Sequence, residues 1–356
     1  MEIYVNDWNA RLDIINTFKS LQWIRRSQSA GEFTLRAPLT AENLSLLQEG
    51  RLLTKSDDPD MMIIDIVNIV DGNKEKLISC FGRSGVSLLD RRIVRVDNNT
   101  QKPLMRGEWS DIVLTMLSRH AINPIDTRRA LPVIYDPAPG LPAGVIEKSV
   151  SWRKLGEALC RLCRQYGLGI RTRWKDGVLS VQPYPLRVNP VVFSKQWGTL
   201  DEEERLISIR EFATDAIVGG AGEFPNRIMS EVSSNLSGFD LFERFVDVSS
   251  ELRPEDYEDA GQYMDSLTQA GRDALLDSVR QDEYTASTTA SSMEYKVDYD
   301  VGDIVNVRSS FGFEAVRLIS EVTETYDRNG RTLDPKFEPL TFEEDDNGSN
   351  LAIVSV

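Results

Sequence analysis

The sequence predicts a β-rich α+β protein in which two strand-rich segments flank a segment of mixed helices and strands. Short runs of apolar and β-branched residues, bounded by turn residues, fill the first part of the chain and recur in its last third. Between them, helical spacing and a proline-rich stretch replace the strand pattern. The 356 residues also exceed what one hydrophobic core usually organises. We therefore expect domains at residues 1–95, 96–204 and 205–340, followed by a tail at 341–356.

The first segment is expected to open with short strands at residues 1–5, 12–15, 18–23 and 33–35. A short helix follows, with Thr40 as its N-cap and Gly50 at the position of a C′ glycine. A long hairpin comes next, with strands at 61–70 and 76–81. Asp71-Gly72 is expected to supply the positive-φ residues of its turn.

The middle segment is expected to contain helices at 109–121 and 151–167, a surface loop at 128–142, and strands at 169–174 and 178–181. Ser110 is the expected cap of the first helix, and Asn123-Pro124 is its expected end. Asp176-Gly177 is the expected turn between the two strands. This segment is therefore interpreted as an α+β insertion.

The last segment is expected to begin with strands at 205–209 and 216–218. An acidic helix at 254–280 is then inserted, with Pro254 in its first turn. Its buried face is expected to hold the apolar residues at helical spacing, Tyr257, Met264, Leu267, Leu275 and Val279. A small-residue linker at 287–292 leads to strands over 294–337, where Asn329-Gly330 signals another hairpin. The residues after 340 are polar and acidic.

One order of features occurs in both strand-rich segments. Gly50 precedes a short strand, a gap, a long strand and the Asp71-Gly72 turn. Gly302 precedes the same succession up to the Asn329-Gly330 turn. Two barrels that share a plan would produce this pattern, and so would a chance similarity between two β-meanders.

The charge and the apolar content limit the possible partners. A formal net charge of −15 argues against sequence-independent DNA binding, which requires Lys and Arg to neutralise phosphates. This balance suits a protein that lets nucleic acid pass, and it equally suits any protein that must stay soluble. No apolar run approaches the roughly 20 residues of a membrane span, and the N-terminus lacks a signal-peptide pattern. We expect synthesis in a cytoplasm.

Few residues could carry catalysis or hold a metal. Cys160 and Cys163 form C-x-x-C, but they fall within a helical apolar pattern and are interpreted as core residues. His120 is the single histidine and is expected to cap a helix or lie at the surface. The glycines at 219–222 lack the context of a phosphate-binding loop. No catalytic, cofactor or metal residue is therefore assigned.

Two functional alternatives stay open. The carboxylates at 202–204 and 256–259 could include a glycosidase pair, although nothing selects two of them. The six tryptophans could form a sugar-binding surface, although they are dispersed. The doublets Arg25-Arg26 and Arg91-Arg92 are too small to be nucleic-acid patches.

A set of short motifs holds its order over most of the chain. Its residues are Gly31, Glu32, Phe33, Gly50, Asp71 and Gly72 in the first half, and Gly302, Asp303, Asn329 and Gly330 in the second. This ordered set resembles a family of siphophage tail-tip proteins related to baseplate hubs and to the N-terminal part of tail-associated lysins. Each motif is degenerate alone, and the order carries the resemblance.

The resemblance implies two β-barrel-like tube domains around the α+β insertion, and a homotrimeric hub at the tail tip of a virion. Six similar barrels would then form a ring through which DNA passes without being bound. It also implies contacts with a distal tail or tail tube protein, a tape measure protein, and tip or receptor-binding proteins. Lysin-type relatives continue into an enzymatic domain and this sequence stops at Val356, which favours a structural role. A tail-associated cell-wall hydrolase and a carbohydrate-binding receptor protein are the alternatives.

Overall fold

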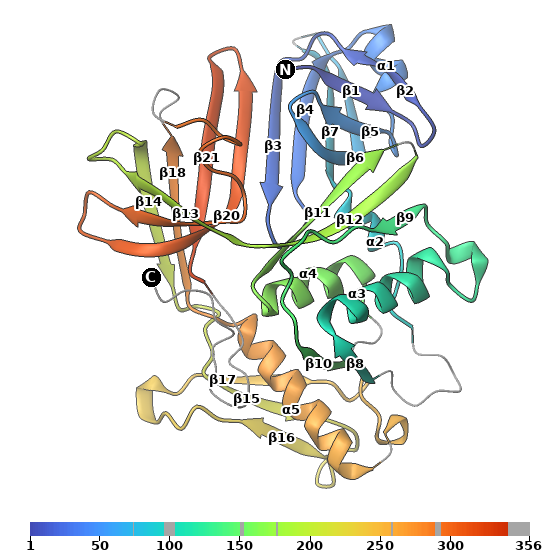
Figure 1. The fold of residues 1–356 in the computed structure, drawn as a ribbon, viewed down its shortest axis with the longest axis vertical. Coiled ribbons are helices and arrows are strands. Elements are labelled where there is room, and N and C mark those ends of the chain that lie inside the picture. The colour runs from blue at the N-terminus through green and yellow to red at the C-terminus, as the bar shows by residue number, and fades with distance from the viewer. Residues whose placement is uncertain are drawn as a thin grey trace.

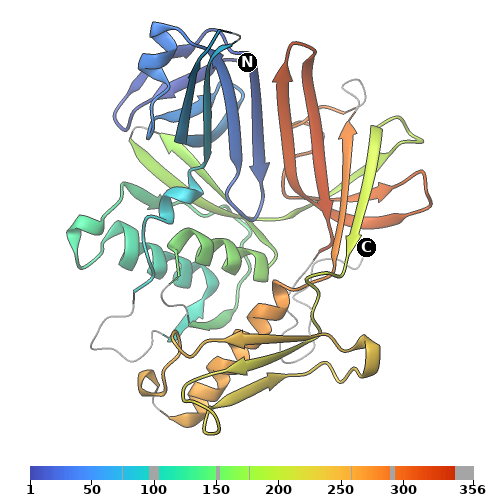
Figure 2. The same cartoon turned by 180° about the vertical axis from the view of Figure 1, so that it is seen from behind.

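The computed structural model describes residues 1–73, 75–95, 104–149, 153–175, 177–257, 259–288 and 293–340. Two strand units lie side by side in the upper half of Figure 1, and a helical unit lies below the first of them. A small unit with a long helix lies at the lower end, as the reverse view in Figure 2 also shows. The expected β-rich α+β class is confirmed. The expected tail at 341–356 and part of the expected linker at 287–292 lie outside the described residues.

The first strand unit is a strongly bent antiparallel sheet in the order β2-β1-β5-β6-β7-β4-β3. Its strands are β1 (Ile3–Asn6), β2 (Arg11–Ile15), β3 (Ser20–Arg26), β4 (Glu32–Pro38), β5 (Leu52–Lys55), β6 (Asp58–Asp71) and β7 (Lys76–Ser84). Helix α1 (Ala41–Leu46) is capped as expected, because Thr40 Oγ1 accepts a hydrogen bond from the Asn43 N–H. Gly50 has a positive φ, but it lies in the turn after the helix has ended.

The second strand unit has the order β13-β19-β20-β21-β18-β14. Its strands are β13 (Arg187–Ser194), β14 (Leu200–Ser208), β18 (Gln281–Thr288), β19 (Asp303–Arg308), β20 (Glu314–Asp327) and β21 (Gly330–Glu338). Strand β20 pairs with β3, so the two units form one continuous sheet. Within the described residues, neither unit closes its strands into a ring of hydrogen-bonded pairs. Each unit is therefore an open sheet.

Two hairpin turns differ in detail from the sequence prediction. Asp71 pairs with Lys76, so the first loop is longer than two residues, and Gly72 does not have a positive φ. In the second hairpin Asp327 pairs with Gly330, so the loop residues come one position earlier than expected. Gly330 keeps the expected positive φ. The hairpins themselves are confirmed.

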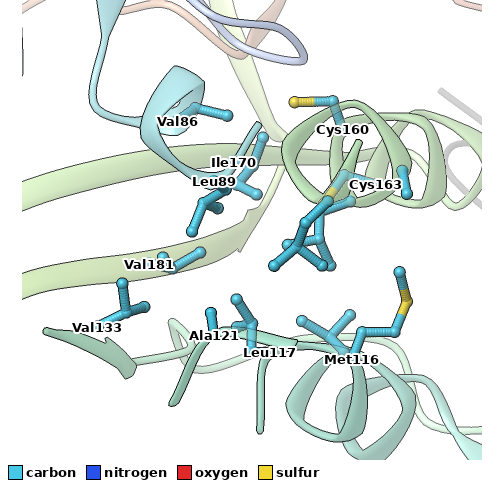
Figure 3. Packing of buried hydrophobic residues seen from close by; sticks show 14 of the residues in the cluster. Val86, Leu89, Met116, Leu117, Ala121, Val133, Cys160, Cys163, Ile170 and Val181 are labelled. Atoms are coloured by element: carbon cyan, nitrogen blue, oxygen red, sulfur yellow. The ribbon is translucent and has the colours of Figure 1, made fainter. Parts of the chain in front are cut away.

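The helical unit packs α3 (Trp109–Leu117) and α4 (Leu155–Gln165) around one core, with β11 (Leu168–Lys175) and β12 (Val178–Pro185) along its other side. Figure 3 shows Met116, Leu117 and Cys163 meeting in this core. The other elements are α2 (Val86–Leu89), β8 (Leu104–Glu108), a π-helical turn (Ser118–Ile122), a 3-10 turn (Thr127–Arg129), β9 (Val133–Tyr135) and β10 (Val145–Ser149).

Helix α3 begins at Trp109, as expected, but Glu108 occupies the N-cap position. Ser110 is therefore not the cap; its hydroxyl lies 2.8 Å from the Tyr135 hydroxyl. The chain leaves the helical segment at Asn123, as expected. The expected hairpin of β11 and β12 is present, because Lys175 pairs with Val178 and Gly177 has a positive φ; Asp176 of the expected turn lies outside the described residues.

The small unit combines β15 (Asp215–Gly219), β16 (Met229–Val232) and β17 (Glu243–Asp247) with helix α5 (Ala260–Leu276). A 3-10 turn (Gly238–Asp240) precedes β17. The prediction that the helix starts at Pro254 was wrong, because Pro254 lies in a separate 3-10 turn (Pro254–Asp256) and Asp259 caps α5 by accepting from the Gln262 N–H. No described helix is long and apolar enough to cross a membrane.

The buried face of α5 also differs from the predicted stripe. Of the predicted stripe, Leu267 is buried as expected, but Met264 and Val279 are exposed. Tyr263 and Gly271 complete the buried row. A Cβ on Gly271 would lie 2.8 Å from a Val232 methyl carbon, so the helix approaches the strands most closely at this glycine. The packed row therefore repeats every four residues and ends at this glycine.

Candidate assembly interface

The residues that could carry chemistry are buried or already engaged. His120 is 8% exposed, so the surface alternative is wrong; it lies in the π-helical turn at the end of the helical segment. Cys160 and Cys163 are buried core residues, as expected, and burial raises the pKa of Cys160 to about 12. Within the described residues, no group of three His, Cys, Asp or Glu side chains is arranged to hold a metal ion.

Two of the carboxylates considered for hydrolysis, Glu203 and Asp259, are engaged in structural contacts. The side chain of Glu203 accepts hydrogen bonds from the hydroxyls of Ser310 and Tyr284. Burial would raise the pKa of Glu203, but these hydrogen bonds outweigh it and lower the pKa. A general acid at neutral pH needs the opposite shift. Asp259 is used as the cap of α5.

The aromatic residues show no assembled sugar-binding surface among the described residues. Trp23 and Trp109 are buried, and Trp8 packs edge-on against Trp174 at a ring distance of 5.4 Å. Trp197 is exposed, next to Arg308. A single exposed indole does not provide the stacked aromatic faces that carbohydrate binding uses.

The motif residues of the first half lie near the junction of β3 and β4. Phe33 is buried against Trp23. Gly31 is confined by the backbone, since a Cβ there would lie 2.3 Å from the Ile24 carbonyl oxygen. Glu32 accepts a 2.9 Å hydrogen bond from Arg26. These three residues therefore stabilise the junction of β3 and β4 in the first strand unit.

Gly50 and Gly302 occupy equivalent places in the two strand units. Both have a positive φ, and the N–H of each donates to an isoleucine carbonyl on the long strand, Ile64 at 2.8 Å and Ile319 at 2.9 Å. Asp303 is buried and accepts both hydrogen bonds of an Arg187 guanidinium fork, at 2.9 and 2.6 Å. The remaining motif residues, Asp71, Gly72, Asn329 and Gly330, lie in the two hairpins at the far ends of the long strands.

The two long strands, β6 and β20, show which residues of the two units are equivalent. Strands β6 and β20 both contain 14 residues, and each is irregular at the same place. The pairing of β6 with β7 shifts between Ile64 and Ile66, and that of β20 with β21 shifts between Ile319 and Glu321. The antiparallel strand order β5-β6-β7-β4-β3 thus corresponds to β19-β20-β21-β18-β14, whereas β1 pairs antiparallel with β5 and β13 pairs parallel with β19. The internal similarity seen in the sequence is therefore a structural repeat.

The two repeats meet along β3 and the second half of β20. Residues from Leu21 to Arg26 pair antiparallel with residues from Tyr326 back to Glu321. Arg25 is buried here, with its guanidinium 2.8 Å from an Asp60 carboxylate oxygen and 2.7 Å from one of Asp300. Burial would lower the pKa of Arg25, but the Tyr295 hydroxyl and the neighbouring carboxylates raise it well above its usual value.

A second buried cluster lies beside the first. The Lys55 ammonium is 2.7 Å from Glu324, and neither side chain is exposed to solvent. Lys296 lies 3.1 Å from Asp58 and 3.6 Å from Glu324, and Arg331 donates to Glu324 at 2.9 Å. Burial would raise the pKa of Glu324, but Lys55 and Lys296 outweigh it and lower the pKa to about 2. These charges join the two repeats.

The sequence analysis did not identify this network. Arg25 was considered only as part of a basic doublet, and Glu324 was not considered. A signal was present in the alternation of the strands: Arg25 follows Trp23, and Glu324 follows Val322, at the inward spacing of two residues. Charged residues at core positions of a strand indicate buried partners.

Each repeat leaves one edge open at the other side. Among the described residues, β14 pairs only with β18, and β6 beyond Ile64 pairs only with β7. The apolar side chains exposed along these segments are Leu206, Ile207 and Ile209 after or within β14, and Ile66, Ile69 and Val70 in β6. Exposed apolar edges of this kind usually pair with another chain. They form the candidate assembly interface.

A cavity of about 280 Å³ with both polar and apolar lining residues lies between α4 and the small unit. Arg161 on α4 reaches across it and forms ion pairs with Asp277 at 3.2 Å and Asp273 at 3.8 Å. Arg244 donates to the Ser278 hydroxyl. The Arg161 ion pairs link the two units, whereas the Arg244 contact lies within the small unit; the arrangement indicates an internal joint rather than a substrate site.

Solved structures share this fold at low sequence identity. A tail protein of prophage MuSo2 from Shewanella oneidensis has a TM-score of 0.57 at 13% identity, with 95% of this chain and 98% of that chain covered. The prophage tail protein gp18 from Listeria monocytogenes has a TM-score of 0.51 at 13% identity, over 96% and 95% of the two chains. A tail protein from Neisseria meningitidis has 0.50 at 13%, over 94% and 95%. No curated protein matches the sequence.

A family model describes the same span of the sequence that carries the repeat. It is that of the Siphovirus ReqiPepy6 Gp37-like proteins, and it matches residues 1–337. The match therefore includes both strand units and everything between them, up to the last residues of β21. The chain belongs to the Siphovirus ReqiPepy6 Gp37-like protein family.

Proposed function

We propose that this chain is a structural protein of a phage tail tip, where three copies form a hub around a channel for DNA. Membership of a siphovirus family and the fold shared with prophage tail proteins support a place in the tail. The observation that carries the ring is the repeat. Two equivalent units join through β3 and β20 within the chain, and the corresponding edges, β14 and β6, are open at its two ends.

Such a chain can associate head to tail. An interface between two different surfaces generates a closed ring when its rotation closes. Three copies would provide six equivalent units, the number that the sixfold tail tube implied by the siphophage resemblance requires. Neighbouring copies would then satisfy the open edges, and the strand units would act as barrel-like tube domains in the assembly. We retain the domains 1–95, 96–204 and 205–340 as a proposal; β13 and the first part of β14, although within 96–204, pair with strands of the second unit.

The charge of the chain supports passage of DNA without binding. With a formal net charge of −15, the ring would carry a strongly acidic total charge. Acidic surfaces repel phosphates and so leave a channel unobstructed. We propose a virion location, with a distal tail or tail tube protein, a tape measure protein, and tip or receptor-binding proteins as neighbours.

A structural role accounts for the engaged carboxylates better than hydrolysis does. The described candidates cap a helix or accept hydrogen bonds, and no specific contact favours a cell-wall hydrolase or a carbohydrate receptor. We propose that the chain is not an enzyme and that Gly31, Gly50, Gly302 and Asp303 maintain the repeat.

The mass of the purified protein in solution tests the hub. Light scattering at micromolar concentration should give three times the chain mass of 40.2 kDa. Electron microscopy of that species should show a threefold ring with an open centre. A closed dimer or tetramer would contradict the proposal, because its units could not form a ring of six.

A further inference from the structure

We propose that β14 of one copy pairs antiparallel with the second half of β6 of the next copy, in one defined register. In that register Arg205 lies opposite Ile69 of the next copy, and Leu206 lies opposite Asn68. The inference rests on the proposed ring of copies, and it adds the partner strand and the residue pairs. It treats the junction of β3 and β20 inside the chain as the template for the contact between chains.

Strand pairings that occur in both repeats show which residues of one repeat are equivalent to which residues of the other. The irregularities on the long strands make Glu321 equivalent to Ile66, so Glu324 is equivalent to Ile69. On the neighbouring strands, Lys336 pairs with Thr285 as Phe81 pairs with Thr34. Tyr284 in β18 is therefore equivalent to Phe33 in β4.

The same comparison extends to the edge strands β14 and β3. Tyr284 pairs with Arg205 in β14, and Phe33 pairs with Trp23 in β3. Arg205 is therefore equivalent to Trp23. Within the chain Trp23 pairs with Glu324. Between chains, Arg205 must then pair with the equivalent of Glu324, which is Ile69.

The complete register follows from this one pair. Antiparallel strands advance one residue each in opposite directions. The pairs between copies are Ser208 with Ile66, Ile207 with Val67, Leu206 with Asn68, Arg205 with Ile69, Glu204 with Val70, and Glu203 with Asp71. A slip of one residue would turn every side chain to the other face, so the register is a strict prediction of the repeat.

The surface chemistry of both edges fits this pairing. Ile66 is 58% exposed and Ile69 is 51% exposed in the single chain, and both lie where the template positions Glu321 and Glu324 are covered by β3. Ile207 is 45% exposed, whereas its equivalent Arg25 is buried. Isolated edges normally carry charges or proline that prevent pairing. Here Ile69 and Ile207 occupy positions that are buried in the template, Glu324 and Arg25, and Ile66 occupies the position of the half-buried Glu321.

One proposed pair, Glu203 with Asp71, is unfavourable, and existing contacts of both side chains reduce the repulsion. Glu203 would lie opposite Asp71, and like charges at directly opposed positions repel. The Ser310 N–H and hydroxyl both donate to Glu203, and Lys76 lies 3.0 Å from Asp71. The repulsion is therefore confined to one end of the ladder and is partly neutralised there.

Disulfide trapping tests the register. In the template the Ser27 N–H donates to the Ser320 carbonyl, so the alternation of the ladder makes Ile24 and Thr323 a non-hydrogen-bonded pair. Their equivalents are Leu206 and Asn68. Cβ atoms in such pairs lie about 4.5–5.5 Å apart, within reach of a disulfide after small adjustments. Leu206→Cys with Asn68→Cys in one chain should cross-link neighbouring copies under mild oxidation.

A second variant provides the matched control. Leu206→Cys with Val70→Cys places the second thiol two residues further along the same face. Diagonal partners lie about 7–8 Å apart, too far for a disulfide without backbone movement. The three native cysteines are buried, which keeps background cross-linking low. The oligomeric mass of both variants is also measured by light scattering before oxidation.

The outcomes separate the register from the ring. A three-copy species in which the proposed pair cross-links at least about tenfold more than the control would support the register. A three-copy species in which the control cross-links equally, or in which the proposed pair does not cross-link, would overturn the register and leave the hub proposal intact. A single-chain mass for the unmodified protein at every concentration, with no cross-link in either variant, would overturn both proposals.

Discussion

The junction inside the chain and the open edges occupy equivalent places in the repeat but use opposite chemistry. Inside the chain, Arg25 and Glu324 lie in buried ion pairs. At the equivalent places on the open edges are Ile207 and Ile69, which are exposed. A contact within one chain forms in every folded molecule, so it can use charges whose attraction only offsets their desolvation. A contact between copies must also offset lost translational and rotational freedom, and burial of apolar surface supplies that free energy.

The largest expected effect comes from breaking the internal junction. Glu324→Ala removes the carboxylate between Lys55, Lys296 and Arg331, and leaves the buried Lys55 ammonium with the more distant Asp57, at 3.8 Å, as its ion-pair partner. We expect the free energy of unfolding to fall by about 3–5 kcal/mol, measured by urea denaturation. Glu314→Ala, on the same strand, removes an exposed ion pair with Arg308 and should cost less than about 1 kcal/mol. Equal losses would contradict a special role for the junction.

Acid should weaken the internal junction in a defined range. The pKa of Glu324 is lowered from 4.5 to about 2 in the folded chain. A carboxyl whose folded pKa is depressed stabilises the fold above its unfolded pKa, and this contribution disappears as the pH falls from about 4.5 towards 2. The contribution is about 3 kcal/mol.

Urea denaturation between pH 5 and pH 3 measures this dependence. Other carboxyls with lowered pKa values, such as Asp282 and Asp215, also titrate there. The difference in slope between the wild type and Glu324→Gln isolates the junction, because glutamine does not titrate. Parallel curves for the two proteins would show that Glu324 does not contribute.

A substitution on the open edge should weaken association of the copies and leave the stability of the single chain almost unchanged. Ile207→Lys places a charge where the proposed contact buries an apolar side chain. We expect dissociation of the oligomer to increase at least about tenfold, while the unfolding free energy of the single chain changes by less than about 0.5 kcal/mol. Analytical ultracentrifugation over a concentration series measures the first quantity.

Val279→Lys is the matched control for this edge. Val279 has the same exposed fraction as Ile207, 45%, but lies in the loop after α5. The control should leave the mass of the assembly unchanged. If both substitutions dissociated it equally, the effect would come from added charge and not from the edge.

The smallest expected effect is on association, at the one unfavourable pair of the proposed register, Glu203 with Asp71. Asp71→Lys should replace a repulsion with Glu203 of the neighbouring copy by an attraction. We expect association to tighten by less than about 1 kcal/mol, and the gain to shrink as salt is added. The same ultracentrifugation series in low and high salt measures it. Asp65→Lys is a control at an exposed β6 position before the proposed pairs, although it also removes an ion pair with Arg83.

Much of the local structure could be predicted from the sequence. Periodicity and turn residues located the strands around both long hairpins, and Thr40 was correctly identified as a helix cap. The errors came where neighbouring elements decided the outcome. The packed row of α5 follows Gly271, because only a glycine allows the close approach to Val218 and Val232. Helical spacing alone could not show which of several apolar rows would face the sheet.

The order of glycine, short strand and long strand already indicated a repeat in the amino-acid sequence. Hydrophobic alternation and turn chemistry are local, so the residues themselves determine them. The sequence could not show that β3 pairs with β20, that Arg25 meets Asp300 far along the chain, or that β14 and β6 are left open. Those features depend on which edges meet in space. Only the tertiary structure decided them, because many strands of similar composition could pair and the long-range packing selects among them.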